Sequence, residues 1–212
     1  DCSYYSDCSS KISSWSCKSG YKQEGSSCVV ARPSCNIGDI FYSDNTCSAD
    51  VVSGKTVLGI VVHNNNGGIG GQIMAPWPVD ANGNKTNSNS TGLVWAKWGT
   101  DISSLPKFPS WEAASTDYDS CGNTDKIVAL CAASNCQAAW ATRKYAPTSE
   151  TNGKWCLPAA GILRNIQKNQ DAISTAVSKV GGASSLLNYW LWSSSEYSSY
   201  GAWDALLSGS GL

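Results

Sequence analysis

The sequence contains one His, one Met and two Phe among its 212 residues, and only 15% of the residues are charged. The single imidazole, His63, has no nucleophile signature such as G-x-S-x-G beside it, which argues against hydrolytic catalysis. The formal net charge of −1 supplies no basic field for nucleic acid or an anionic membrane surface. No run approaches the roughly 18 consecutive apolar residues of a membrane span. We therefore expect no enzyme, no nucleic-acid partner and no direct membrane insertion.

Cysteine, in contrast, occurs ten times, without the C-x-x-C spacing of metal sites and thiol oxidoreductases. So many thiols are typical of disulfide-bonded proteins in oxidising compartments, and the start at Asp1 is typical of a processed product. We expect an extracellular protein, secreted or on the cell surface, with no metal and no cofactor. All ten cysteines are predicted to form bridges: Cys2, Cys8, Cys17, Cys28, Cys35, Cys47, Cys121, Cys131, Cys136 and Cys156.

Residues 1–35 are predicted to be a cysteine-rich appendage, because five cysteines and few aliphatic side chains cannot form a core without covalent links. Within it, the C-K-S-G-Y segment that begins at Cys17 and precedes Cys28 resembles half of an EGF-like module. That resemblance implies a Cys17–Cys28 bridge. Cys2–Cys8 is one option among several. Residues 36–212 are predicted to form the main domain.

The main domain begins with strand patterns. The β-branched run 57–62 and the segment 37–42 predict strands, and the turn residues 43–46 favour a hairpin bridged by Cys35 and Cys47. Residues 93–98 alternate and are predicted to form a further strand. The polar stretch 80–91 predicts an exposed loop with sequons at Asn84 and Asn89.

Two helices are predicted later in the chain. The first has Thr124 as N-cap and extends to about Tyr145. The second begins after Pro158, places apolar residues such as Ile162 and Ile166 on one face, and ends at Gly181. Helices amid several strands indicate the α+β class.

Five separated motifs stand in one order along residues 36–207: N-I-G-D-I-F-Y-S-D from Asn36, G-K-T-V-L-G-I-V from Gly54, N-T-D-K-I from Asn123, W-C-L-P from Trp155, and W-S-S-S-E-Y from Trp192. Together they resemble the bacterial Fibrobacter-type major paralogous domain, which is related to the Lcl C-terminal domain and to C-type-lectin-like folds. The resemblance implies a lectin-like α+β domain with two helices on short antiparallel sheets.

Some relatives of that family are the variable proteins of diversity-generating retroelements, which present ligand contacts on the same Trp-, Tyr- and Ser-rich segment. By this resemblance, Trp192, Ser194, Glu196, Ala202 and Trp203 are scaffold positions. Tyr and Trp supply rigid contact area and Ser supplies adaptable hydrogen bonds. The alternative is that the large aromatic residues belong to the core. The residues expected to face the ligand are Leu191, Tyr197, Ser198, Ser199, Tyr200, Asp204 and Leu206.

The superfamily also contains oxidases with a pair of reactive cysteines. Cys131 and Cys136 are spaced i, i+5 on the predicted helix, which does not place both thiols on one face. Cys121 and Cys156 are available as bridge partners. Structural disulfides are therefore expected.

Calcium is a second chemistry to weigh, because lectin-like domains often bind it through carboxylate and amide oxygens. Asp117, Asp119, Asn123 and Asp125 cluster at the start of the first predicted helix. Helix capping and favourable interaction with the helix dipole explain these residues equally well. The E-P-N and Q-P-D tripeptides of calcium-dependent lectins are absent. No metal site is predicted.

The sequence thus predicts an extracellular, non-enzymatic ligand-binding or adhesion protein whose contact surface lies within residues 189–207. The expected partner is a protein or glycan on another cell or surface. The alternative is a structural subunit of a cell-surface filament that binds copies of itself. Family members continue for a further strand or two beyond the W-S-S-S-E region, so an open sheet edge is expected here, and such edges pair with other chains.

Overall fold

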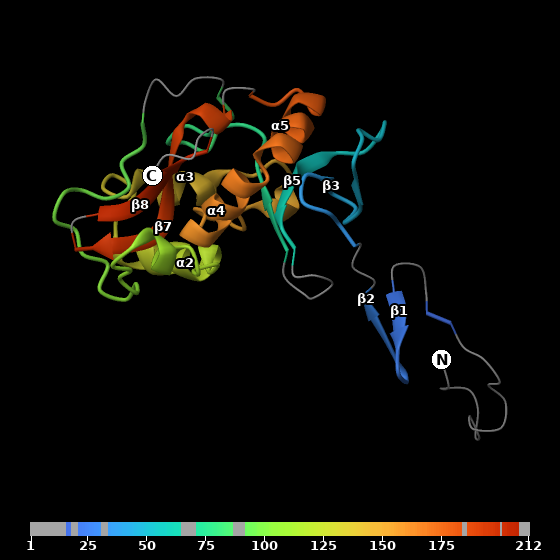
Figure 1. Cartoon of the computed structure of the whole chain (residues 1–212), viewed down its shortest axis with the longest axis horizontal. Coiled ribbons are helices and arrows are strands. Elements are labelled where there is room, and N and C mark those ends of the chain that lie inside the picture. The colour runs from blue at the N-terminus through green and yellow to red at the C-terminus, as the bar shows by residue number, and fades with distance from the viewer. Residues whose placement is uncertain are drawn as a thin grey trace. The chain divides into compact units, whose positions relative to one another are not determined.

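The computed structural model describes residues 16–17, 21–30, 34–64, 71–86, 92–183, 186–199 and 201–207, and the chain divides into two compact units, Asp1–Ser34 and Cys35–Leu212. In the first unit, β1 (Tyr21–Glu24) and β2 (Ser27–Val30) form an antiparallel hairpin (Figure 1). The predicted Cys17–Cys28 bridge is confirmed. The Cys2–Cys8 option lies outside the described residues.

Four antiparallel strands form the larger sheet of the second unit: β3 (Ile40–Tyr42), β4 (Cys47–Ser48), β5 (Val57–His63) and β6 (Gln72–Met74). Their order is β4-β3-β5-β6. The predicted strands at 37–42 and 57–62 are confirmed, as is the bridge from Cys35, which belongs to this unit, to Cys47. Five consecutive residues of β5 are buried, as expected for a β-branched run.

The helices differ from the prediction of two, because the described residues contain five α-helices and two short 3-10 helices. Helical hydrogen bonding stops at Cys131, whose extended backbone opens a turn closed by the Cys131–Cys136 bridge. It stops again at Asn169, whose backbone leaves the helical region. The elements are α1 (Trp111–Ala114), α2 (Ser120–Leu130), α3 (Gln137–Lys144), α4 (Ala160–Lys168), α5 (Gln170–Lys179), η1 (Ser149–Thr151) and η2 (Leu186–Asn188).

Two further predictions of helix ends have different outcomes. The N-cap of α2 is Asp119, whose carboxylate accepts from the Gly122 N–H, so the prediction of Thr124 was wrong. The Thr124 hydroxyl is buried inside α2 and accepts from the Leu157 N–H at 3.0 Å. The end of the second helical stretch at Gly181 is confirmed, and this glycine has φ of 64°, as a left-handed C-terminal residue requires.

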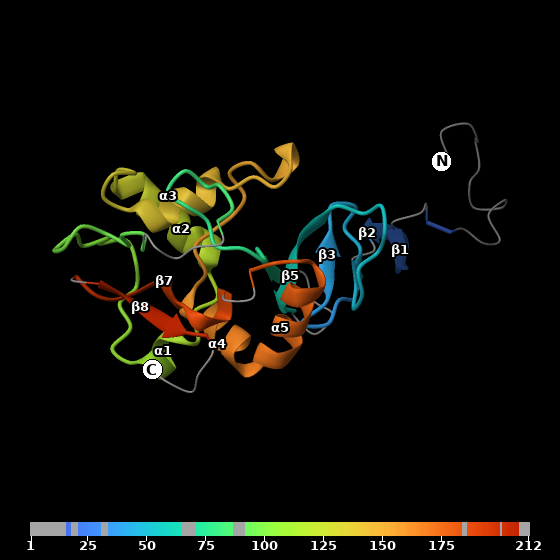
Figure 2. The same cartoon turned by 90° about the horizontal axis from the view of Figure 1, so that it is seen from above.

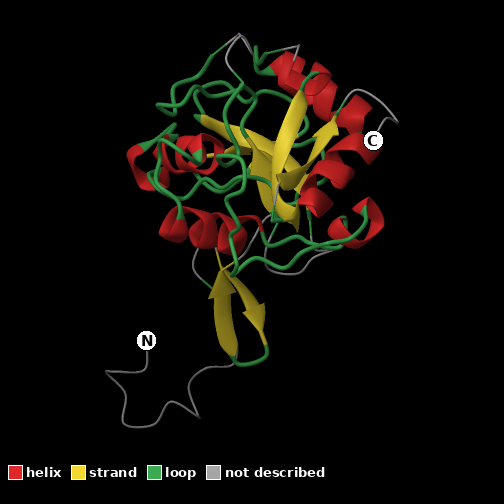
Figure 3. Cartoon of the chain, turned by 90° about the vertical axis from the view of Figure 1, so that its left-hand side faces the viewer, coloured by secondary structure: helices red, strands yellow, loops and turns green. Residues whose placement is uncertain are grey.

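The apolar side chains gather in two clusters. The first cluster, around Ile60, Leu163 and Ile173, joins the four-stranded sheet to α4 and α5. The second cluster, around Ile127 and Leu157, joins α2 and α3 to the segment before α1. Figure 2 shows the two helix pairs on different sides of the unit, and Figure 3 shows helices flanking the strands.

A second, two-stranded antiparallel sheet consists of β7 (Trp190–Ser198) and β8 (Gly201–Leu206). Ala205 of β8 belongs to the first cluster and Ala202 to the second, so this hairpin contacts both.

The segment 93–98 is not a strand, and that prediction was wrong. Its alternation arises because Trp95 fills the second cluster and donates its indole N–H to the Ser193 carbonyl at 2.8 Å, while Val94 stays exposed. None of the described helices has the length and apolar character needed to span a bilayer.

Candidate functional site

A cavity of about 500 Å³ lies where the two apolar clusters of the second unit meet. Leu163 and Leu191 contribute to its wall from the first cluster, and Leu157 and Ala138 from the second. The lining comes from β5, β6, α3, α4, β7 and the segment that precedes α4. Cavities of this size and character enclose small molecules in other proteins.

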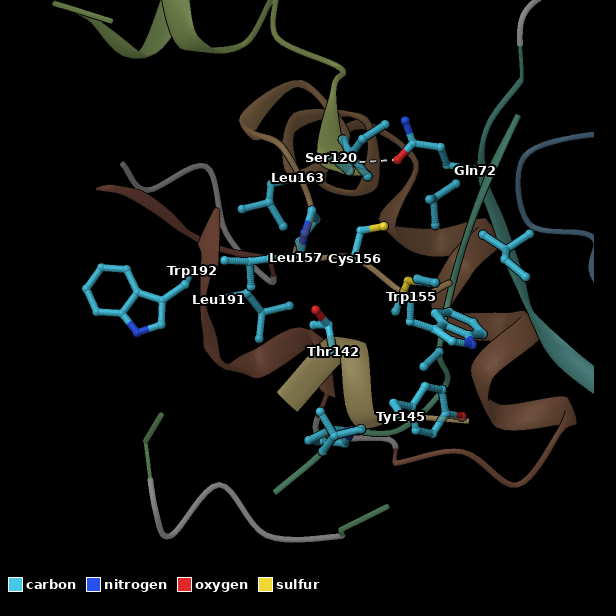
Figure 4. A pocket seen from close by; sticks show the side chains of 18 of the residues that line it. Gln72, Ser120, Thr142, Tyr145, Trp155, Cys156, Leu157, Leu163, Leu191 and Trp192 are labelled. Carbon is cyan, nitrogen blue, oxygen red and sulfur yellow. Dashed lines mark hydrogen bonds between the residues drawn. The ribbon is translucent and has the colours of Figure 1, made fainter. Parts of the chain in front are cut away.

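Figure 4 shows how these side chains surround the cavity. Leu191 and Thr142 point toward its centre from β7 and α3. Tyr145 and Trp155 lie together at one side, with their rings edge to face and centroids 5.0 Å apart. Trp192 lines the cavity only at its base, because its indole is directed away and donates to the Leu93 carbonyl. The cavity surface is therefore mostly aliphatic, with an aromatic pair at one side.

Several polar side chains in this lining are already bonded within the protein. The Ser120 hydroxyl donates to the Gln72 side-chain carbonyl at 2.8 Å (Figure 4), and the Gln72 amide donates to the Tyr118 carbonyl. The hydroxyls of Thr142 and Thr151 donate to backbone carbonyls in their own segments. Such groups have little capacity left for a polar ligand.

The Tyr145 hydroxyl differs from these groups. The side chain is only 3% exposed, and its oxygen has no hydrogen-bond partner among the described residues. Burial raises the pKa of this phenol above its usual value, so the group remains a protonated donor at neutral pH.

A disulfide between Cys121 and Cys156 forms part of the cavity wall. It ties the start of α2 to the segment 151–158, and Arg143 donates toward the Cys156 sulfur at 3.3 Å while pairing with Asp125. The pairing of Cys131 with Cys136 shows why the i, i+5 argument was wrong, since the residues between them are not helical. The expectation of structural disulfides is confirmed for the eight described cysteines.

The residues predicted to face a ligand do not share one surface. Leu191 pairs with the fully buried Ala205, and both contact the first cluster. Asp204 pairs with Trp192, and Leu206 pairs with Trp190, which places them on the opposite face of the hairpin. Asp204 is half-buried there, and burial raises its pKa.

The remaining predicted residues lie at the far end of the hairpin. Tyr197 is 47% exposed and packs edge to face on Trp203, with centroids 5.8 Å apart. Ser198 and Ser199 are half-buried, and Tyr200 lies outside the described residues. Of the predicted set, Leu191 alone is among the described residues of the cavity lining.

The S-S-S-E part of the late motif is buried and holds α4 in place. The Ser195 hydroxyl accepts from the Ala160 N–H at 2.9 Å and donates to the Asp117 carboxylate at 2.7 Å. The neighbouring N–H groups of Ala159 and Gly161 donate to the Ser120 hydroxyl and the Asp117 carbonyl. The first turn of α4 is thus capped by other segments of the chain rather than by its own N-cap residue.

The acidic cluster has structural contacts of the same kind. Asp117 accepts from Ser195 and Asn123, Asp119 caps α2, and Asp125 pairs with Arg143. No group of three or more His, Cys, Asp or Glu residues in the described part of the chain is arranged to hold a metal ion.

His63 also has partners within the protein. It is the last residue of β5, as predicted for a strand end. Its Nδ1 lies 2.9 Å from the Asn165 side-chain nitrogen, and its ring stacks on Tyr118.

No family model, no curated protein and no solved structure matches this chain. The interpretation of the site therefore depends on its own geometry. Thr142, Tyr145 and Leu163 were missed by sequence reasoning, because they lie on separate helices and carry no shared local pattern. The W-C-L-P segment was the available signal, since its Trp155, Cys156, Leu157 and Pro158 all line the cavity.

Glu196, the last residue of the buried motif, gives the first testable prediction. Its Oε1 accepts from the Ile102 N–H at 3.3 Å, and its Oε2 has no partner among the described residues. Burial raises the pKa of this carboxyl, nearby Asp101 raises it further, and Lys107 opposes both. The folded state therefore binds the proton more tightly than the unfolded state. The stabilisation is complete below the unfolded pKa of about 4.3 and is lost as the pH rises through the folded pKa.

We expect Glu196→Gln to remove this loss. In urea unfolding between pH 4 and pH 7, the free energy of unfolding of the variant should gain on that of the wild type as the pH rises, by on the order of 1 kcal/mol. Glu112→Gln, on an exposed position of α1, controls for loss of a carboxylate and should show no such gain. Parallel pH profiles for the wild type and Glu196→Gln would contradict the assignment.

Proposed function

We propose that the protein is an extracellular, non-enzymatic binding protein that encloses an apolar ligand, or an apolar part of a larger one, in the cavity of its second unit. The observation that carries the proposal is the cavity itself: about 500 Å³, walled by Leu157, Leu163, Leu191 and the Tyr145–Trp155 pair. Burial of apolar surface is the main source of affinity in such sites.

The hydrogen bonds of the lining favour binding over catalysis. Acid–base or nucleophilic chemistry needs a side chain that is free to exchange a proton or attack the substrate. The hydroxyls of Ser120 and Thr142 instead donate to acceptors of the protein. Four disulfides in the described part of the chain support an extracellular location.

The proposal includes a C-type-lectin-like fold, in which the W-S-S-S-E segment is scaffold. Complete burial of Ser194 and Glu196 supports that role. Trp190 is 55% exposed and also lines the cavity, so an exposed aromatic side chain lies at the cavity's edge. A protein or glycan that carries the apolar group would contact this edge and the exposed side of β7 and β8. Self-assembly through an open sheet edge stays the alternative prediction.

The proposal is tested by filling the cavity. Thr142 points toward its centre from the half-buried side of α3 (Figure 4), so Thr142→Phe should occupy the space without changing the surrounding core. We expect the wild type to enhance the fluorescence of N-phenyl-1-naphthylamine on binding, and the variant to bind this probe at least about 10-fold more weakly.

Thr175→Phe is the matched control. The Thr175 hydroxyl also donates to a backbone carbonyl within its helix, but it lies on the exposed side of α5 and outside the cavity lining. This variant should bind the probe as the wild type does. If Thr142→Phe folds and binds the probe with unchanged affinity, the cavity is not the binding site.

A further inference from the structure

The Tyr145 hydroxyl is an unusual feature of the cavity lining. Three buried side-chain oxygens of the described residues have no hydrogen-bond partner: Tyr145 Oη, Ser194 Oγ and Glu196 Oε2. Of these three residues, only Tyr145 lines the cavity. A buried hydroxyl without a partner is costly, and such groups in proteins generally have an explanation in function or in a bound molecule.

The surroundings of this hydroxyl define what it can bind. The Tyr145 ring packs edge to face on Trp155, and both belong to the largely apolar wall. The other polar groups of the lining, such as Gln72, Ser120 and Thr142, are bonded within the protein. A ligand with many hydroxyls, such as a sugar, would leave most of them unpaired in this cavity.

An anionic group is disfavoured at the same position. A carboxylate enclosed beside Tyr145 would have to lose its hydration, and one phenol donor compensates only a small part of that cost. The cation in the lining, Lys154, is exposed and so lies at the solvent side. A neutral acceptor such as a ketone or ether oxygen needs only the single donor that the wall supplies.

We infer that the ligand, or the part of it that enters the cavity, is a small, neutral, mostly apolar group with one acceptor oxygen, and that the Tyr145 hydroxyl donates a hydrogen bond to this oxygen. The inference rests on the proposed function, because it names the chemistry recognised in the same cavity. It assigns Tyr145 as a specificity-determining residue, with Leu157, Leu163, Leu191 and Trp155 supplying the apolar contacts.

Two naphthalenes of nearly equal shape test this assignment. 2-Acetylnaphthalene carries one carbonyl oxygen, and 2-ethylnaphthalene carries none. Tyr145→Phe removes the hydroxyl and keeps the ring that packs on Trp155. We expect the ratio of the affinities for the ketone and the hydrocarbon to be about 5- to 10-fold higher in the wild type than in the variant, as for a typical buried hydrogen bond.

Tyr118→Phe is the control, because it removes a phenol that is 40% exposed and outside the cavity lining. Its affinity ratio should equal that of the wild type. 2-Naphthoate, which has the same ring system and a carboxylate, should bind the wild type more weakly than the ketone does.

The possible failures are distinguishable. If both naphthalenes bind, Thr142→Phe weakens both, and Tyr145→Phe leaves their ratio unchanged, the role of the hydroxyl is wrong and the proposed function stands. Binding of 2-naphthoate as tight as that of the ketone would overturn the preference for a neutral group. If neither naphthalene binds the wild type, the proposed function and this inference both fail.

Discussion

Replacing Cys121 and Cys156 together by Ala should lower the free energy of unfolding by about 4 kcal/mol and weaken probe binding as well. The bridge closes a loop with a sequence separation of 35, and the chain-entropy model assigns about 4 kcal/mol to a loop of this length. Both cysteines line the cavity, and the bridge fixes the segment 151–158 against α2. Without it, Trp155 and Leu157 lose part of their fixed placement in the wall, so affinity falls with stability.

The Cys131–Cys136 bridge provides the comparison for this prediction. Its sequence separation is 5, for which the same model gives about 2 kcal/mol, and neither cysteine lines the cavity. Replacing this pair by Ala should therefore cost less stability and leave probe binding unchanged. Urea unfolding and titration with N-phenyl-1-naphthylamine measure both quantities. Equal losses of binding in the two double variants would show that the first bridge has no special relation to the cavity.

Ser195→Ala should destabilise the protein by about 2–3 kcal/mol, a large effect for the loss of one oxygen atom. The Ser195 hydroxyl accepts from the Ala160 N–H and donates to Asp117 inside the protein. Alanine leaves that N–H without its acceptor at the start of α4 and removes one of the donors to a carboxylate. Both groups are costly to leave unpaired because water does not reach them.

The adjacent Ser194 makes this prediction sharp. Ser194 is as buried as Ser195, and its hydroxyl has no partner among the described residues. Ser194→Ala removes the same atom from the same strand, but it should change the free energy of unfolding by less than about 0.5 kcal/mol, or increase it. Chemical denaturation of the two variants measures the difference. Equal destabilisation would mean that burial of the motif, and not the capping of α4, determines its contribution.

Local signals were sufficient for much of the fold. The β-branched run 57–62 became β5, the turn between Cys35 and Cys47 became a bridged hairpin, and Gly181 ended α5. Each of these depends on neighbouring residues, so a sequence pattern can reveal it. The burial of Ser193 to Glu196 gave no such signal, because the partners of these polar residues lie far away in the chain.

The helix boundaries and the cavity depended on distant contacts. Thr124 has the side chain of an N-cap, but it bonds to Leu157 inside the protein, and Asp119 caps the helix. The cavity lining comes from six parts of the chain, with Thr142 and Leu191 49 positions apart in the sequence, calculated as 191 minus 142. An aromatic, Ser-rich segment predicted a surface on the hairpin, whereas most of the cavity wall comes from residues without any distinctive composition.

The most direct test of the account is an NMR experiment that locates 2-acetylnaphthalene on the isotope-labelled full-length protein. The account predicts intermolecular nuclear Overhauser effects from the probe to the methyl groups of Thr142, Leu163 and Leu191, which line the cavity. Contacts instead with the exposed side chains of Leu130 or Tyr197, with none to the three lining residues, would contradict it.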